Sequence, residues 1–514
     1  MRLRIDDREV DVAPGSTILD AARQAGVSIP TLCHRNGHTP ITSCFVCVVR
    51  VNGSPRLSPS CSTRAAEGMV VASDSPDVRE ARRTALELMF GDHLGDCLGP
   101  CQSVCPAHMD IPAMIRFISA GQMRQAIVTV KEKISLPAVL GRICPEICEG
   151  GCRRGNKDAP VAVCLLKRHA ADIDLLSDDP YLPPCEPSSG KRAAILGTGP
   201  AGLSAAYYLQ QAGVDCDLFD SQALAGGMLR YGVGQDRLPW EVLDAEIGIV
   251  SKLGAAFHLG EPAFDGPALL KLRDTFDAVL LATGPTQAGK PLISGLAMAG
   301  QGVKVDRRTL ATNLPGFFAA GAVVTPTRHA VRSVAAGRLA ALGIVSSLTG
   351  ASVVAVEREF TVRMGKVEGV ELDRFMATAV DAPRAVVSAD RGLDLTSALT
   401  EANRCMHCDC RKKQTCSLRD FAIEYAVDPR AYAGERREFE QDLSDSRIVF
   451  EPGKCIACGI CVHVAGDGPI GLAFNGRGFH VRVTTPFHAS LSDALGDRAG
   501  ECVESCPTGA LAWR

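Results

Sequence analysis

The sequence predicts a multidomain protein of mixed α/β and α+β class, and three observations carry this prediction. The chain has 514 residues, enough for about three domains of ordinary size. Its 22 cysteines gather at short spacings in several groups instead of scattering singly. Between these groups, an apolar strand runs directly into a Gly-x-Gly-x-x-Gly loop, which is typical of a dinucleotide-binding βαβ fold.

Composition narrows the class of protein. The net charge is −3, from 55 basic and 58 acidic residues, so no nucleic-acid partner is expected. No uninterrupted apolar run reaches the roughly 18 residues of a membrane span, and the start MRLRIDDREVDV lacks the apolar core of a signal peptide. We therefore expect a cytoplasmic protein without a transmembrane segment. Cysteines in such a chain stay reduced, so clustered ones favour metal or Fe–S ligation.

Residues 1–78 predict a β-grasp 2Fe–2S domain. The strand-like segments RLRI and EVDVA precede a helical segment, STILDAARQAGV, for which Ser16 is the expected N-cap. Four cysteines follow with the spacing C-x10-C-x2-C-x13-C: Cys33, Cys44, Cys47 and Cys61. Four thiolates are what a 2Fe–2S cluster needs, and a zinc site is the alternative.

The surrounding segments CHRNGHTPITSCFVCVVRVNG and PSCSTRAAEGMVV resemble the N-terminal domain of the large Fe–S subunit of respiratory complex I and related hydrogenase subunits. In that family, a histidine four residues before a cysteine ligates a 4Fe–4S cluster. His93 precedes Cys97 by four here, so the resemblance implies that His93 is a ligand. A solvent-exposed histidine is the alternative.

Residues 79–180 predict a helical domain with two 4Fe–4S clusters. The segments MDIPAMIRFISAGQMRQA and GRICPEICEGGC resemble the Fe–S domain of the glutamate synthase small subunit. Relatives carry a glutamate ligand where this chain has Lys167, and Cys164 stands one helical turn earlier, either as a relocated ligand or as a buried helix cysteine. The resemblance implies two ligand sets: His93, Cys97, Cys101 and Cys152, and then Cys105, Cys144, Cys148 and Cys164.

Residues 190–348 predict a dinucleotide-binding domain. The segment KRAAILGTGPAGLSAAYYLQQAGVDCDLFD reads as a strand, a glycine loop, a helix and a second strand that ends in an acid. Gly197, Gly199 and Gly202 permit the tight turn and the close approach of backbone to a pyrophosphate at the helix N-terminus. Asp220 is expected to accept a hydrogen bond from a ribose hydroxyl.

The next segment, AGGMLRYGVGQDRLPWEVLDAEI, resembles the FAD stretch of glutamate synthase small-subunit relatives, so FAD is the implied cofactor. The resemblance adds further contact residues: Gly227, Arg230, Gly284 and Gly321. Relatives carry aspartate, which typically touches the ribityl chain, where this chain has Ala322. The effect of this replacement on flavin binding stays open.

The same family inserts a complete NAD(P)H domain after the strand that ends at Gly284. Here Val303, in the strand that should follow the insertion, is only nineteen positions later (303 − 284). A second βαβ fold does not fit in this space. We therefore expect that the chain does not bind NAD(P)H in the manner of the family.

Two more cysteine groups end the chain. Residues 349–447 form a linker region with a C-x2-C-x-C-x5-C run, which predicts a 4Fe–4S cluster or, alternatively, a zinc site: Cys405, Cys408, Cys410 and Cys416. Residues 448–514 retain one complete ligand set of a two-cluster ferredoxin: Cys455, Cys458, Cys461 and Cys506. Cys502 is left over from the second set, and Cys185 and Cys216 are unassigned.

Together these patterns predict an electron-transfer subunit with FAD, one 2Fe–2S and three to four 4Fe–4S clusters. Its partners are expected to be catalytic subunits of the diaphorase, hydrogenase or formate dehydrogenase type, because complex I-like Fe–S domains commonly adjoin such enzymes. No catalytic triad or molybdenum-site motif is found. The alternatives are a self-contained flavin reductase of a small substrate or quinone, an electron-bifurcating subunit, and a scaffold that holds clusters without flavin.

Overall fold

The computed structural model describes residues 1–261, 266–285, 292–350, 359–387, 391–466 and 470–514. They form two compact units, neither of which is one continuous stretch. Unit 1 comprises Met1–Leu98, Phe360–Arg374 and Asp409–Arg514, and unit 2 comprises Gly99–Glu359 and Phe375–Cys408. Unit 2 therefore interrupts unit 1 along the sequence, a division that differs from the five consecutive segments expected above.

Unit 1 begins with the expected β-grasp arrangement, a five-stranded sheet in the order β2-β1-β5-β3-β4. Its elements are β1 (Arg2–Ile5), β2 (Arg8–Asp11), α1 (Ile18–Gln24), β3 (Val48–Val51), β4 (Leu57–Pro59) and β5 (Val70–Ala72). β1 pairs antiparallel with β2 and parallel with β5. Thr17, and not the expected Ser16, is the N-cap of α1, because its side chain and that of Asp20 bond each other's backbone N–H groups in a capping box.

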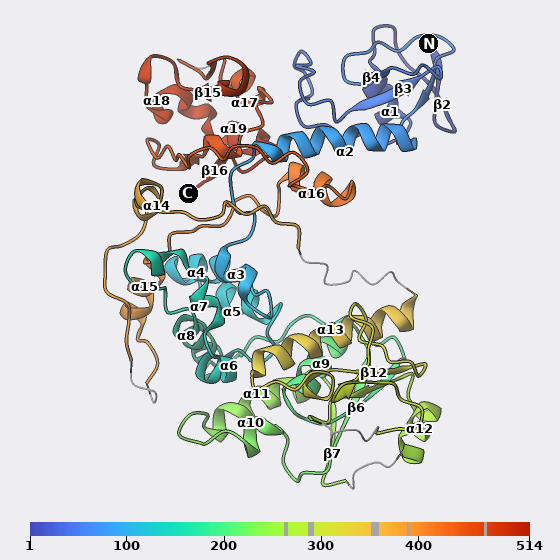
Figure 1. Cartoon of the computed structure of the whole chain (residues 1–514), viewed down its shortest axis with the longest axis vertical. Coiled ribbons are helices and arrows are strands. Elements are labelled where there is room, and N and C mark those ends of the chain that lie inside the picture. Colours follow the sequence, from blue (N-terminus) through green and yellow to red (C-terminus); the bar gives the residue numbers. More distant parts are fainter. Residues whose placement is uncertain (262–265, 286–291, 351–358, 388–390, 467–469) are drawn as a thin grey trace. The chain divides into compact units, whose positions relative to one another are not determined.

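The C-terminal residues complete unit 1 around a second core. Its elements are α2 (Pro76–Gly91), α14 (Gly369–Met376), which runs past the end of the unit, α16 (Ser417–Glu424), β13 (Ile448–Phe450), α17 (Ile460–Ala465), β14 (Ala473–Asn475), β15 (Arg482–Thr484), α18 (Leu491–Leu495), α19 (Ala499–Ser505) and β16 (Leu511–Trp513). Leu32 and Cys33 of the N-terminal part share one apolar cluster with Ile448 and Leu511. The two ends of the chain are therefore packed as one unit (Figure 1).

Main-chain contacts join the two sides of the interruption. Asp96 and Asp409 form a parallel β-bridge, and the N–H of Cys410 donates to the carbonyl oxygen of Cys97 at 3.4 Å. The chain thus first leaves unit 1, after Leu98, beside the place where it makes its second return, at Asp409.

Unit 2 begins with a helical bundle whose helices pack through α4–α5, α5–α8 and α6–α8 contacts. The helices are α3 (Pro100–Val104), α4 (Ile111–Ser119), α5 (Met123–Lys131), α6 (Pro137–Ile143), α7 (Ile147–Gly150), α8 (Val163–Leu175) and α15 (Leu395–Asn403). α15 comes from the end of unit 2 and packs on α4 and α8. The segment that carries Cys405 is thereby brought to the helical domain.

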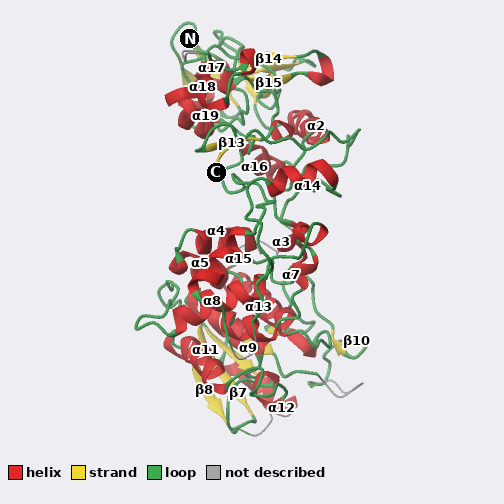
Figure 2. Cartoon of the chain, turned by 90° about the vertical axis from the view of Figure 1, so that its left-hand side faces the viewer, coloured by secondary structure: helices red, strands yellow, loops and turns green. Residues whose placement is uncertain are grey.

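The rest of unit 2 is built on a five-stranded parallel sheet in the order β12-β9-β6-β7-β8, with helices packed against it (Figure 2). The elements are β6 (Arg192–Leu196), α9 (Pro200–Gln211), β7 (Asp215–Asp220), α10 (Met228–Tyr231), α11 (Trp240–Lys252), β8 (Ala256–Leu259), α12 (Gly266–Thr275), β9 (Ala278–Leu281), β10 (Met298–Ala299), β11 (Gly302–Val303), β12 (Phe317–Ala319) and α13 (Ala330–Thr349). The first strand, β6, lies between β7 and β9, so the strand order reverses at its carboxyl end. Ligands bind at such switch points in α/β sheets.

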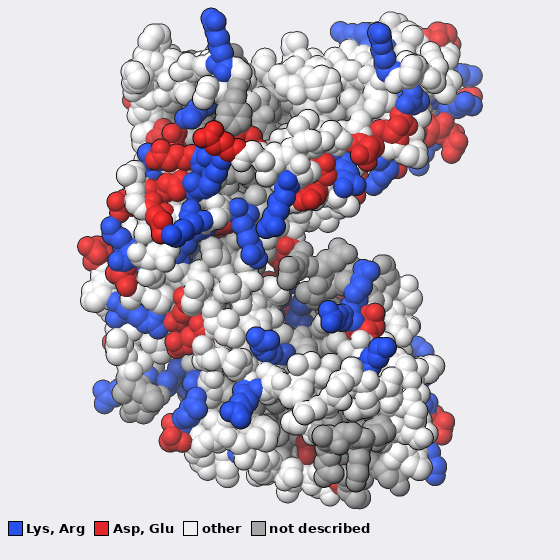
Figure 3. All heavy atoms as spheres, in the orientation of Figure 1, with Lys and Arg blue, Asp and Glu red and all other residues white. Residues whose placement is uncertain are grey.

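By length and composition alone, α13 could cross a membrane, although it contains charged residues such as Arg332 and Arg338. In this structure α13 packs along α9 and against β9 and β12, and it buries Val334, Gly337 and Ile344. These contacts make α13 a core helix of the parallel-sheet domain. Figure 3 shows basic and acidic side chains interspersed over the visible face, in keeping with the nearly balanced charge.

The close packing of α13 on α9 predicts a large effect of one methyl group. A Cβ atom at Gly337 would collide with the carbonyl oxygen of Ala201. We expect Gly337→Ala to destabilise the protein by about 1–3 kcal/mol, measured as a lower midpoint of thermal unfolding. The control is Gly248→Ala in α11, where a Cβ meets no atom within 4 Å; an equal loss in both variants would contradict the role of close packing.

Candidate functional site

The four N-terminal cysteines are brought together in unit 1. Cys33, Cys44, Cys47 and Cys61 are all buried. A hydrogen bond with Cys44 lowers the pKa of Cys33 to about 5, and one with Cys47 lowers the pKa of Cys61 to about 7. The charges of Cys33 and Cys44 also act on Cys61, so the two pairs are neighbours. The same hydrogen bonds raise the pKa of Cys44 and Cys47, so one sulfur of each pair favours the thiolate form, which is the form that ligates metals.

A second group in unit 1 joins residues from both sides of the interruption. His93, Cys97, Cys410 and Cys416 line one cavity, together with Lys413 and Lys454. Burial, and then the charge of Lys454, lower the pKa of His93 to about 4, which keeps the imidazole neutral. Its Nδ1 atom is shielded from solvent and has no hydrogen-bond partner among the described residues. A neutral imidazole with a buried, unpaired nitrogen fits a metal ligand.

This group differs from the one that the sequence predicted. His93 and Cys97 were expected to share a site with Cys101 and Cys152, which belong to unit 2. The C-x2-C-x-C-x5-C run was expected to hold a single metal, yet Cys405 and Cys408 belong to unit 2 whereas Cys410 and Cys416 belong to unit 1. The physical reason is the main-chain pairing of Asp96 with Asp409, which places Cys410 beside Cys97.

The other four cysteines of the two expected sets all belong to unit 2: Cys101, Cys152, Cys405 and Cys408. Contacts within unit 2 bring the segments that carry them together. The guanidinium of Arg154, two residues after Cys152, donates to the carbonyl oxygen of Arg404 at 2.6 Å, next to Cys405. A Cβ atom at Gly151 would lie 3.1 Å from the carbonyl oxygen of Pro100, next to Cys101. The segments bearing Cys101, Cys152 and Cys405 are therefore neighbours, and Cys408 follows three residues later.

A fourth group surrounds Lys167 on α8. Cys164 interacts through its thiol with both Cys144 and Cys148, and the charges of these three cysteines and of Cys105 all act on Lys167. These are the four cysteines that the resemblance placed in one ligand set: Cys105, Cys144, Cys148 and Cys164. Cys164 is buried and faces other thiols, which differs from the alternative of an isolated helix cysteine.

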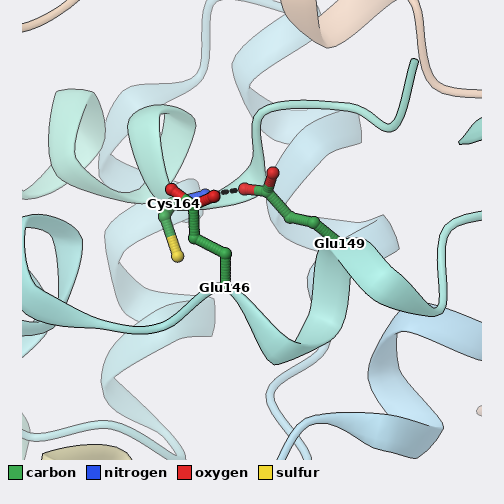
Figure 4. Close-up of side chains that lie close together, drawn as sticks. All are labelled: Glu146, Glu149 and Cys164. Carbon is green, nitrogen blue, oxygen red and sulfur yellow. Dashed lines mark hydrogen bonds between the residues drawn. The ribbon is translucent and has the colours of Figure 1, made fainter.

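Two glutamates lie beside this group (Figure 4). Oxygen atoms of Glu146 and Glu149 and the sulfur of Cys164 all lie within 4.8 Å of one another. Glu149 accepts the backbone N–H of Cys164 at 3.0 Å and forms an ion pair with Arg384 at 2.6 Å. These contacts fix the start of α8, from which the Cys164 side chain projects.

The fifth group lies in the C-terminal part of unit 1. Cys455, Cys458, Cys461 and Cys506 line one cavity. Cys502 is fully buried beside them, with its thiol 3.8 Å from the carbonyl oxygen of Cys461, but it does not line the cavity. Of the unassigned cysteines, Cys185 is exposed and Cys216 is buried in β7.

The dinucleotide pocket lies at the carboxyl end of β6 and has a volume of about 860 Å³. Gly197 has a φ of 103°, and a Cβ atom there would collide with Ala282. Asp220 accepts bonds from the N–H and the hydroxyl of Thr198 at 2.8 and 2.6 Å, so it fixes the glycine loop in addition to lining the pocket. The chain therefore provides the cradle that a pyrophosphate requires.

The predicted cofactor residues divide into two sets. The first lines the pocket: Gly197, Gly199, Asp220, Gly227 and Gly284. The second does not: Gly202, Arg230 and Gly321. Gly202 allows α9 to pack on the carbonyl of Gly197, and Arg230 is buried in a network with Ala225 and Asp244. Ala322, next to Gly321, lines the pocket instead.

Several lining residues were missed by the sequence analysis, above all Arg237 and Arg328. Both are exposed and lie outside regular elements, so no motif identified them. Ile143, the last residue of α6, also lines the pocket and directly precedes Cys144. Between β9 and β12, the described residues contain one hairpin, β10–β11, as their only paired strands.

The ligand grouping predicts which cysteines share a metal. We expect Cys97→Ser and Cys410→Ser to change one EPR signal of the reduced protein and Cys405→Ser to change a different one, because the two sites lie in different units. Cys185→Ser, at an exposed thiol, is the control and should leave iron content unchanged. Loss of the same signal in Cys405→Ser and Cys410→Ser would contradict the grouping.

Three family models match the chain. Residues 1–76 match the 2Fe–2S iron–sulfur cluster binding domain. Residues 94–178 match the dihydropyrimidine dehydrogenase domain II, 4Fe–4S cluster. Residues 195–247 match the NAD(P)-binding Rossmann-like domain. The mixed fold class expected from the sequence is confirmed by these matches.

Curated relatives match part of the chain. The NADP(+)-dependent formate dehydrogenase subunit beta of Moorella thermoacetica is 36% identical over 217 residues, which cover 38% of this chain and 31% of the relative. The NAD-dependent dihydropyrimidine dehydrogenase subunit PreT of Escherichia coli is 36% identical over 196 residues, 38% of this chain and 47% of the relative. The small chain of glutamate synthase [NADPH] from Bacillus subtilis is 31% identical over 212 residues, 41% of this chain and 43% of the relative.

The chain thus spans about a third to a half of the length of these relatives. The resemblance to the glutamate synthase small subunit is confirmed by this similarity. The chain therefore combines a 2Fe–2S domain, a 4Fe–4S domain and a Rossmann-like dinucleotide-binding domain, and it is similar to subunits of oxidoreductases.

Proposed function

We propose that the chain is an electron-transfer subunit of a multisubunit oxidoreductase, in which FAD exchanges electrons with Fe–S clusters and, through them, with a partner catalytic subunit. One observation carries this proposal. Ile143 lines the dinucleotide pocket and is bonded directly to Cys144, which belongs to the thiol group around Lys167. A flavin in the pocket and a cluster on those thiols would be close neighbours, as electron exchange between them requires.

The cofactor inventory follows from the ligand groups. One 2Fe–2S cluster is assigned to Cys33, Cys44, Cys47 and Cys61. Four 4Fe–4S clusters are assigned to four sets: His93, Cys97, Cys410 and Cys416; Cys101, Cys152, Cys405 and Cys408; Cys105, Cys144, Cys148 and Cys164; Cys455, Cys458, Cys461 and Cys506. This assignment changes two of the sets predicted from the sequence, the set that contained His93 and the single metal at 405–416.

FAD supplies two-electron chemistry and can release electrons singly, which is why flavins join hydride donors to Fe–S clusters. The residues of the pocket have the task of binding and orienting it. The glycine loop and the N-terminus of α9 receive the pyrophosphate, and the guanidinium groups of Arg237 and Arg328 provide positive charge at the rim. Ala322, which replaces the aspartate of relatives, contributes no polar contact.

The partner is proposed to be a catalytic subunit of the diaphorase, hydrogenase or formate dehydrogenase type, and the compartment the cytoplasm. Support for the partner comes from the similar proteins, which are subunits of a formate dehydrogenase and a dihydropyrimidine dehydrogenase. We also propose that NAD(P)H does not react with this chain directly. The short connection between β9 and β12 supports this second proposal.

The inventory predicts metal and flavin contents. Anaerobically purified protein should hold about one flavin and about 18 iron atoms per chain, from one 2Fe–2S and four 4Fe–4S clusters. Elemental analysis and the visible spectrum measure both. About 14 iron atoms with one zinc would remove one of the four cubane assignments, and a chain without flavin would overturn the proposal in favour of a cluster scaffold.

The missing nicotinamide domain predicts a kinetic result. Dithionite should bleach the flavin of the isolated chain, whereas NADH and NADPH should leave its absorbance unchanged over minutes in a stopped-flow experiment. Addition of the native partner subunits should restore reduction by their own substrate. Rapid bleaching by NADH or NADPH would contradict the proposal, and steady turnover of a soluble donor and acceptor by the isolated chain would favour a self-contained reductase.

A further inference from the structure

Four lysine side chains in the described residues are buried to 4% exposure or less: Lys131, Lys167, Lys413 and Lys454. Burying an ammonium group is costly unless an opposite charge lies nearby. Each of these four lysines should therefore have a negatively charged group beside it in the folded protein.

Three of the four lysines have a carboxylate partner. Lys131 forms an ion pair with Asp174 at 2.8 Å, Lys413 pairs with Asp409 at 3.2 Å, and Lys454 pairs with Glu451.

Lys167 is different. Its ammonium lies 3.8 Å from the sulfur of Cys164, and no carboxylate among the described residues forms a salt bridge with it. The compensating charge must therefore come from the thiol group itself.

The acidic groups near Cys164 do not neutralise Lys167. Glu149 and Glu146 both form ion pairs with Arg384, at 2.6 and 3.8 Å. The buried ammonium therefore lies beside a thiol of the group that the proposed function assigns to one cluster, and no carboxylate among the described residues pairs with it.

We propose that Lys167 is a tuning residue, whose fixed positive charge favours the reduced state of the 4Fe–4S cluster on Cys105, Cys144, Cys148 and Cys164. The inference rests on the proposed function, because it takes those thiols as cluster ligands. Reduction adds one electron and no proton, so the cluster becomes more negative by one charge beside the ammonium. The cluster next to the dinucleotide pocket would then accept electrons more readily than it would without this lysine.

The test is a potentiometric titration of the full chain, followed by EPR. Cys164→Ser first identifies the signal of this cluster. In Lys167→Met, the ratio of reduced to oxidised cluster at a fixed potential should fall at least about tenfold, a shift of about 59 mV for one electron. Lys167→Arg keeps the charge and should stay within about threefold of the wild type. Arg168→Met removes another buried cation of the same helix, which is paired with Asp172, and it should have little effect.

The outcomes separate the two proposals. A wild-type chain without iron would overturn both, whereas Lys167→Met with full iron content and an unchanged potential would overturn only the role of Lys167. If Lys167→Met and Lys167→Gln both lose the cluster and Lys167→Arg retains it, the charge is required by the thiol group and the inference is supported. If Lys167→Arg also loses the cluster, the role of Lys167 is steric, and the inference about its charge is overturned.

Discussion

The main-chain pairing between the segments at Cys97 and Cys410 is the constraint on which unit 1 depends. The N–H of Cys410 donates to the carbonyl oxygen of Cys97, and the preceding residues Asp96 and Asp409 form a β-bridge. Because this pairing closes the chain where unit 2 departs, unit 1 can fold as a compact body from three separate stretches. The same pairing brings His93 and Cys416 to one cavity.

Buried charge is the second common feature of the ligand groups. Thiolates gathered in an apolar interior repel one another, and cations placed beside them offset this repulsion. Lys413 and Lys454 line the cavity with His93, and Lys167 lies within the thiol group of α8. Lys413 and Lys454 are paired with carboxylates and add little net positive charge to their cavity. Lys167 has no carboxylate partner among the described residues, so it adds a whole positive charge to its thiol group. The ligand groups therefore differ in their electrostatic surroundings although they use the same kind of ligand.

Within unit 2, the parallel sheet and the helical domain meet at the dinucleotide pocket. The reversal of strand order at β6 opens the pocket, and the end of α6 supplies Ile143 to its wall. The pocket and the thiol group around Lys167 thus meet at the end of α6, since Cys144 follows Ile143 directly. The relation is local and does not depend on how the two units are arranged.

The sequence alone determined the fold class, because the glycine loop and the cysteine spacings are local signals. Close spacing did not decide which sulfurs meet, since Cys405 and Cys408 belong to unit 2 whereas Cys410 and Cys416 belong to unit 1. The sequence could not determine how Cys97, Cys101, Cys405 and Cys410 are distributed, since these residues approach one another only when the chain returns to unit 1 after a long excursion. The resemblance to known families implied a different partition, in which His93 and Cys97 share a site with Cys101 and Cys152. Likewise, Arg237 and Arg328 line the pocket from loops that carry no sequence motif. Arg230 was expected to contact the cofactor, but its side chain is buried in an ion pair with Asp244. Tertiary structure decided these cases because contacts between residues distant in sequence leave no periodic or local signal.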